Sequence, residues 1–150
     1  IPSMGKQGTS GKESYLVFST SRDVPTNGAW ELVENGVLYT TTSSVASKLK
    51  FAGVDSTGNV YLSNSKITKI KNTENTPFGV FTLYVPTTKH ESSLLYLRGY
   101  MVVRHKIDDN NEERMIIYTD VYKASYNNPY RDNCSVPSNT GRYRRGPFRS

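Results

Sequence analysis

Short runs in which apolar and polar residues alternate follow one another through the middle of the chain. The runs at 48–51 and 66–71 have this pattern, and 79–85 is rich in β-branched and aromatic residues. Alternation with a period of two turns one side of a strand toward a core and the other toward water. No 11-residue window carries a capped amphipathic helical stripe, and we expect a single helical turn at 44–49. The pattern predicts an all-β fold, an antiparallel β-sandwich or jelly roll, over residues 14–123.

Turn residues predict two hairpins in the first half of this domain. Asn35-Gly36 separates two strand-like runs. This dipeptide is the strongest short-range hairpin signal, because a type I′ turn needs positive φ at both central residues. The turn sequence at 55–58 indicates a second hairpin that ends in a strand at 60–62. The apolar residues that the first hairpin would turn to one inward face are Trp30, Leu32, Val37 and Tyr39.

The longest pair of apolar segments lies in the second half. Residues 94–107 and 114–122 flank the polar stretch 108–113. We expect an antiparallel hairpin with a projecting acidic tip, and a bulge or bend at Gly99 inside its first strand.

The two ends of the chain differ in composition from the middle. Residues 1–13 are mostly Gly, Lys, Gln, Ser and Thr, and they are expected to form a flexible lead or linker. Residues 124–150 contain three prolines with many Asn and Ser, and they are expected to form an irregular extension. The sequence begins without Met and without a hydrophobic segment, so we expect a fragment or processed product with no signal peptide.

The positive charge is concentrated in the C-terminal extension. The chain has 150 residues, 19 Lys plus Arg, 13 Asp plus Glu and a net charge of +6. Residues 124–150 contain five arginines and one acid. Arginines interleaved with aromatic residues bind phosphates and stack on bases, although a solvated basic tail has the same composition. The arginines expected to contact nucleic acid, a polyanionic glycan or another partner are Arg142, Arg144, Arg145 and Arg149.

Composition excludes several classes of protein. The length suits one domain. A single Cys rules out an internal disulfide framework and a cysteine-based metal cluster. No apolar run reaches the roughly 20 residues of a membrane-spanning helix. We therefore expect a domain without a membrane span.

The candidate chemical groups lie in loops. His90 is close to Ser92 and Ser93, but no strained nucleophile turn surrounds them, and a hydrolase is the least favoured interpretation. The acidic stretch 108–113 lacks the spacing of a calcium loop, so we expect no metal and no cofactor. The residues expected to make exposed loop contacts are Lys89, His90, Asp108, Asp109, Glu112 and Glu113.

Two stretches have the texture of coat-protein strands. Residues 76–86 and 95–103, within a Ser-, Thr-, Asn- and Tyr-rich chain, resemble core strands in the jelly-roll shell or protruding domains of small icosahedral RNA viruses. The resemblance implies a non-enzymatic structural protein of the virion that assembles with neighbouring subunits and attaches to a host. The basic arm of many such shells is N-terminal, whereas the arginines here are C-terminal, which argues against direct genome packaging.

A carbohydrate-binding β-sandwich is the alternative to a shell domain. Tyrosine with Asn, Ser and Gly makes adaptable recognition surfaces, and Trp30 and the many tyrosines could serve as sugar platforms. The inward orientation expected for Trp30 argues against its use as a platform.

Overall fold

The computed structural model describes residues 2–21, 23–25, 29–73, 79–130, 132–134 and 136–146. The elements in chain order are β1 (Ser3–Gly8), β2 (Ser14–Ser21), β3 (Glu31–Thr40), the 3-10 helix η1 (Ser43–Lys48), β4 (Phe51–Val54), β5 (Val60–Leu62), β6 (Thr68–Lys71), β7 (Val80–Pro86), β8 (Leu95–Asp108), β9 (Asn111–Tyr118), β10 (Tyr122–Ala124), β11 (Asp132–Asn133) and β12 (Asn139–Arg145).

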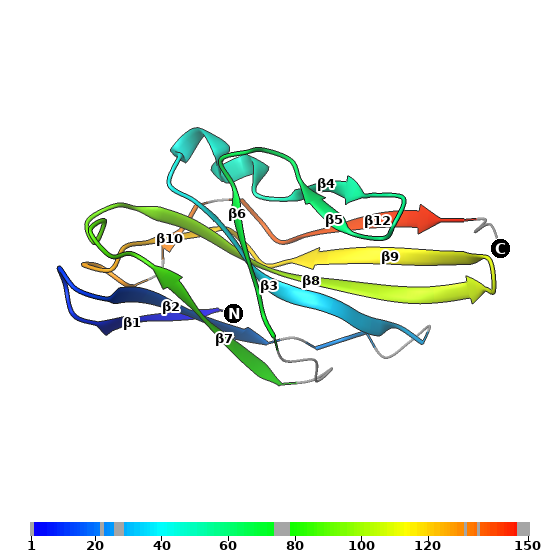
Figure 1. Cartoon of the computed structure of the whole chain (residues 1–150), viewed down its shortest axis with the longest axis horizontal. Helices are drawn as coiled ribbons and strands as arrows, with labels where there is room; N and C mark the ends of the chain where they lie inside the picture. The colour runs from blue at the N-terminus through cyan, green and yellow to red at the C-terminus, as the bar shows by residue number, and fades with distance from the viewer. Residues whose placement is uncertain are drawn as a thin grey trace.

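The strands form an antiparallel sandwich around one central sheet. The seven-stranded central sheet has the order β11-β10-β8-β3-β6, with β9 beside β8 and β12 beside β9. A three-stranded sheet, β1-β2-β7, covers part of one face (Figure 1). The helix η1 and the β4-β5 hairpin cover the opposite face. The predicted all-β sandwich is confirmed.

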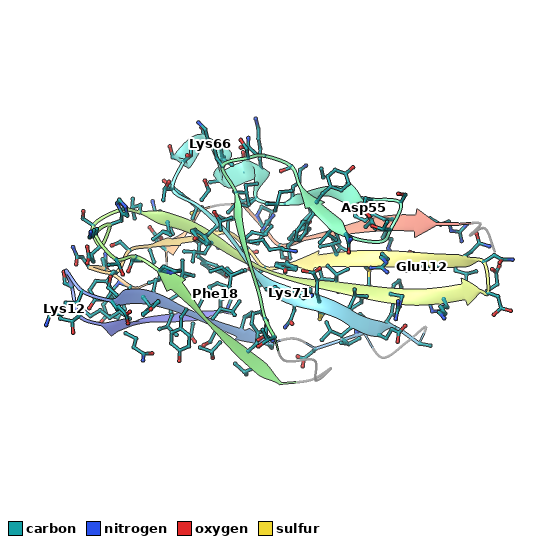
Figure 2. The ribbon with its side chains drawn as sticks, in the orientation of Figure 1. Lys12, Phe18, Asp55, Lys66, Lys71 and Glu112 are labelled. Carbon is teal, nitrogen blue, oxygen red and sulfur yellow. The ribbon has the colours of Figure 1, made fainter. Side chains whose placement is uncertain are left out.

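Strand β8 holds the central sheet together. Along one side it pairs with β3, and along the other it pairs first with β10 and then with β9. Its side chains alternate between the two faces of the central sheet, so they contribute to the apolar core on each face. Leu97 packs under the three-stranded sheet with Phe18 and Leu83, while Val102 packs under η1 with Leu49. Figure 2 shows Phe18 between the two sheets.

The predicted hairpin at Asn35-Gly36 is wrong, because β3 runs straight through both residues. Gly36 pairs with Lys71 on one side and Tyr100 on the other. A Cβ atom at this position would collide with the backbone oxygen of Ile70. Glycine is therefore required here because β6 passes close by, and not because the chain turns.

The four apolar residues of β3 and its approach nevertheless share one face of the sheet. A β-bulge between Leu32 and Glu34 shifts the alternation by one residue. Trp30 and Leu32 consequently pack in the same layer as Val37 and Tyr39, on the side of the three-stranded sheet.

Both ends of the described chain contain strands where irregular backbone was expected. Residues 3–8 form β1, which pairs with β2, and residues 139–145 form β12, which pairs with β9. Backbone hydrogen bonds make these ladders, so small and polar side chains do not prevent them. The hairpin at 55–58, the turn within 44–49 and the β8–β9 hairpin are confirmed. The part of the chain described here contains no helix with the length and apolar content needed to span a bilayer.

Candidate functional site

The C-terminal arginines lie along a strand and not on a free arm. Arg142 and Arg144 are exposed residues of β12, which is held to β9 over its whole length. The Nη1 atom of Arg142 lies 3.0 Å from Oε1 of Glu113 on β9. The backbone of Arg145 ends the strand, while its side chain and the whole of Arg149 lie outside the described residues. One of the predicted contact arginines thus already has an acidic partner.

The acidic tip is shorter than the sequence suggested. Asp108 pairs with Asn111, so the turn consists of Asp109 and Asn110. The Asp108 carboxylate accepts hydrogen bonds from the Asn111 side chain at 2.9 Å and from the Asn110 backbone at 2.8 Å. These bonds, the Asn111 side chain first, lower the pKa of Asp108. Asp108 and Asp109 remain exposed, as predicted.

Neither Glu112 nor Glu113 is an exposed loop residue, which corrects the sequence prediction. Both lie in β9, and Glu113 is only partly exposed. Glu112 is 5% exposed, and its carboxylate is 2.8 Å from Nε of Arg114. Arg114 is also buried and donates to the backbone oxygen of Gly58 at 2.8 Å. The pair joins β9, where Figure 2 labels Glu112, to the β4-β5 turn. No group of three His, Cys, Asp or Glu side chains with metal-binding geometry occurs among the described residues.

Lys89 and His90 are exposed in the loop after β7, as predicted. His90 and Ser93 line one cavity of about 340 Å³ beside Tyr39 and Leu95. The nearby Glu91 carboxylate accepts bonds from the backbone of Gly11 at 2.8 Å and from Ser14 Oγ at 3.3 Å. It therefore fastens the β1–β2 turn. A hydrolytic triad requires its histidine to bond both a serine and a carboxylate. Within the described residues the His90 ring makes neither bond.

Trp30 packs against His105, and their ring centroids are 5.4 Å apart at 44°. The indole is half-buried and contributes to the cluster of Met101 and Val103. One side of the ring is therefore occupied by protein.

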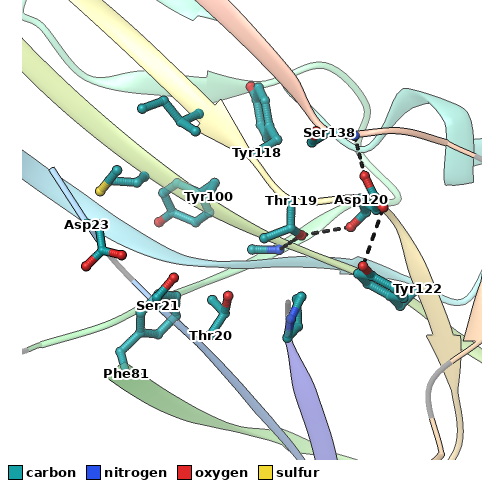
Figure 3. A pocket seen from close by; sticks show the side chains of 14 residues that line it. Thr20, Ser21, Asp23, Phe81, Tyr100, Tyr118, Thr119, Asp120, Tyr122 and Ser138 are labelled. Carbon is teal, nitrogen blue, oxygen red and sulfur yellow. Dashed lines mark hydrogen bonds between the residues drawn. The ribbon is translucent and has the colours of Figure 1, made fainter. Parts of the chain in front are cut away.

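A second cavity, of about 350 Å³, opens where β2 and β9 end (Figure 3). Several of its polar groups bind one another. The Thr119 hydroxyl accepts from the Gly99 backbone at 3.0 Å and donates to the Asp120 backbone at 2.7 Å. The Asp120 carboxylate accepts from the Ser138 backbone and the Asn133 side chain. Asp120 thus fastens the segment before β12 to the body of the sandwich.

The outer face of the three-stranded sheet has a distinctive composition. Alternation turns Leu16, Phe18 and Leu83 inward, so their neighbours along the strands face outward. No charged side chain occurs among these outward residues, in a chain with a net charge of +6. We call this set the neutral face; its members are Ser3, Gly5, Gln7, Tyr15, Val17, Ser19, Ser21, Val80, Thr82, Tyr84 and Pro86.

The apolar residues of the neutral face are partly or well exposed. Val80 is 65% exposed and Tyr84 is 49% exposed. The rings of Tyr15 and Tyr84 meet edge to face, with centroids 6.2 Å apart. The interpretation of the sequence missed this face. The alternation of residues 14–21 contained the signal, because both parities of that run are free of charge.

Comparison with protein-family models, curated proteins and solved structures finds no match to this chain, so its function has to be argued from its own residues.

Proposed function

We propose that this chain is a structural assembly module, a coat-protein domain of a viral shell that packs against neighbouring subunits. The neutral face is the observation that carries the proposal. The buried centres of protein interfaces are depleted of charge and enriched in tyrosine. A patch without charge on a basic protein matches that composition, with Val17, Val80 and Tyr84 as its apolar centre.

The polar loops at the ends of the sandwich suit attachment in this proposal. The turn at Asp109 and Asn110 and the loop with Lys89 and His90 project exposed polar groups. Rigid strands that present variable polar loops are a common arrangement in recognition proteins. In this proposal the loops contact a ligand on the host.

A sugar-binding module has weaker support. Sugar platforms need an open aromatic plane, whereas Tyr15 and Tyr84 meet at 82° and Trp30 packs on His105. An enzyme also has weaker support, because the Glu91 carboxylate is bound to Gly11 and Ser14.

Sedimentation velocity over a range of protein concentrations tests the proposal. We expect a defined oligomer whose fraction rises with concentration. Val17→Lys should reduce the fraction of species larger than a dimer at least tenfold, because it buries a charge at the centre of the neutral face. Ser47→Lys, which adds the same charge on exposed η1 across the sandwich, is the matched control and should leave assembly unchanged. A chain that stays monomeric at every concentration would contradict the proposed function.

A further inference from the structure

The edge strands of the two larger sheets differ in how they are protected. An exposed edge offers unpaired backbone groups to other strands, and proteins commonly block it with charged side chains. Four edges follow this rule: β1 carries Lys6, β6 carries Lys69 and Lys71, β11 carries Asp132, and β12 carries Arg142 and Arg144. The fifth edge, β7, has no charged residue from Val80 to Pro86.

The backbone of β7 alternates between β2 and the open edge. The backbone N–H of Thr87 donates to the backbone oxygen of Ser14 at 3.0 Å, so the backbone groups of Thr87 point toward β2. In an antiparallel ladder every second residue points the same way. The N–H and C=O groups of Val80, Thr82 and Tyr84 therefore point outward, where β7 pairs with no other described strand (Figure 1).

The pairing of side chains agrees with this alternation. Ser19 Oγ and Thr82 Oγ1 are 2.7 Å apart. Such closeness is typical of the non-hydrogen-bonded pairs of a ladder, whose side chains approach more closely. The backbone groups of Thr82 are thus directed away from β2.

The outward residues of β7 are complementary to themselves. If one copy of β7 lies antiparallel to another with Thr82 opposite Thr82, then Val80 lies opposite Tyr84 and Tyr84 opposite Val80. All three pairs face each other with hydrogen-bonding backbone groups. A β-branched residue opposite an aromatic one is a favourable cross-strand pair, and no like charges meet.

The neutral face of one copy is small for a stable interface. Three strands of about seven residues cover roughly 300 Å², from spacings of about 4.8 Å between strands and 3.3 Å per residue. A standard interface buries about 800 Å² per partner. Two sheets joined through β7 would double the neutral face, because antiparallel partners keep their side chains on the same side.

We propose that β7 pairs with β7 of a second copy about a two-fold axis at Thr82, which makes one continuous six-stranded sheet. This inference rests on the proposed assembly function and specifies its first contact. The two-fold axis gives a closed dimer, and the joined neutral face is the surface through which dimers meet further subunits.

A charge-swap pair of variants tests the register. Thr82→Lys and Thr82→Glu each place like charges directly opposite one another, so each variant alone should lose at least tenfold in dimer affinity. An equimolar mixture should regain the dimer, because Lys then faces Glu. Thr82→Val removes the hydroxyl without adding charge and should dimerise like the parent chain. Circular dichroism of each variant checks that the sandwich is intact.

The outcomes separate this inference from the proposed function. If the parent chain oligomerises and Thr82→Lys oligomerises equally well, the β7 pairing is overturned while assembly stands. If both single variants are monomeric and their mixture is also monomeric, Thr82 does not face its own copy and the two-fold register is overturned. A parent chain that is monomeric throughout overturns both proposals.

Discussion

Arg98 is buried, and its guanidinium binds two carbonyl oxygens from distant parts of the chain. Nη1 donates to Leu49 at 3.1 Å, Nη2 donates to Pro137 at 2.7 Å, and the group lies 5.2 Å from the centre of the Tyr118 ring. Burial lowers the pKa of this guanidinium below its ordinary value. The planar guanidinium therefore connects the central sheet to the residue after η1 and to the C-terminal segment. The compact ammonium group of a lysine would not have this geometry.

Replacing Arg98 with alanine should lower the free energy of unfolding by about 2–4 kcal/mol, because the buried carbonyl of Leu49 and the partly buried bond to the carbonyl of Pro137 lose a charged donor. Urea denaturation measures the change. Arg104→Ala on the same strand is the control. It removes a partly exposed ion pair with Glu31 and should cost at most about 1 kcal/mol. Equal losses in the two variants would show that the carbonyl bonds of Arg98 add nothing.

Tyr118 is expected to make the free energy of unfolding fall at alkaline pH. Its hydroxyl accepts a hydrogen bond from the Phe51 backbone at 2.9 Å, and burial is the main cause that raises its pKa to about 12. Burial also raises the pKa of Tyr100, whose hydroxyl donates to Glu34 at 2.7 Å. Both rings therefore stay neutral in the folded chain at a pH that ionises an unfolded tyrosine.

The sign of the alkaline effect follows from linkage. The contribution of Tyr118 is fully present below the unfolded pKa of about 10, and it is lost as the pH rises toward about 12. We expect the urea midpoint to fall between these two pH values, and Tyr118→Phe to fall less steeply. Absorbance at 295 nm should show some tyrosines ionising only on unfolding. Complete ionisation of all tyrosines in the folded chain would contradict this.

Gly36 provides a test of close packing between strands. Gly36→Ala should cost about 3 kcal/mol or more, because its Cβ would press on the Ile70 backbone and lie 3.0 Å from the Tyr100 ring. Gly5→Ala is the matched control, since a Cβ on β1 would meet nothing within 4 Å. Thermal melts of the two variants give the comparison. Similar melting temperatures would mean that β6 moves aside at little cost.

At the scale of elements, Asn35-Gly36 illustrates the limit of local signals. The dipeptide favours a turn, yet Asn35 is buried, and its carbonyl accepts from the Asn72 backbone at 2.8 Å. These contacts with β6 and β8 override the local preference, and a single sequence does not display them. The β4-β5 turn was predictable because Asp55 bonds locally, to Thr57 and Asn59.

The neutral face could be predicted only in part. Both parities of β7 are apolar, with Phe81 and Leu83 on one side and Val80 and Tyr84 on the other. Alternation alone therefore left open which side faces water. Only the pairing with β2, whose Leu16 and Phe18 are fully buried, decides it. The arginines of β12 could be located in sequence, but their strand depends on β9, a distant partner.

Limited trypsin digestion tests whether β12 belongs to the folded body. Cleavage after Arg142 and Arg144 requires the strand to leave β9, so we expect both sites to resist trypsin until urea opens the sheet. Asp120→Ala removes the anchor of Ser138 and Asn133 and should speed cleavage about tenfold or more. Asp132→Ala, which breaks only an exposed 3.6 Å ion pair with Lys123, is the control. Rapid cleavage of the parent chain would indicate a frayed arm.

At the scale of the whole molecule, two modes of binding should respond to salt in opposite ways. Copies with a net charge of +6 repel one another, so screening should strengthen assembly through the neutral face. Binding of nucleic acid or heparin through Arg142 and Arg144 would weaken steeply with added salt, because the release of counterions on binding then gains less entropy. Raising salt to about 0.5 M, where the Debye length is about 4 Å, separates the two. Assembly that weakens like polyanion binding would point to contacts between charges.

Glu113 offers a second measurement of the arginine surface. Because its carboxylate lies 3.0 Å from Arg142, Glu113→Gln should free that guanidinium and raise heparin affinity severalfold at low salt. Fluorescence anisotropy with a labelled oligosaccharide reads the change. Unaltered affinity would mean that β12 does not contact the polymer.

The position of β8 governs how the chain reaches its fold during synthesis. Glu31 of β3 meets Arg104 of β8, and 73 positions separate them. Until the ribosome has released β8, the apolar residues of β3 lack their partner strand and stay exposed to water. Pairing between distant segments slows folding, because the chain loses the entropy of closing a long loop before the stabilising contacts form. The central sheet therefore cannot form until β8 has been synthesised.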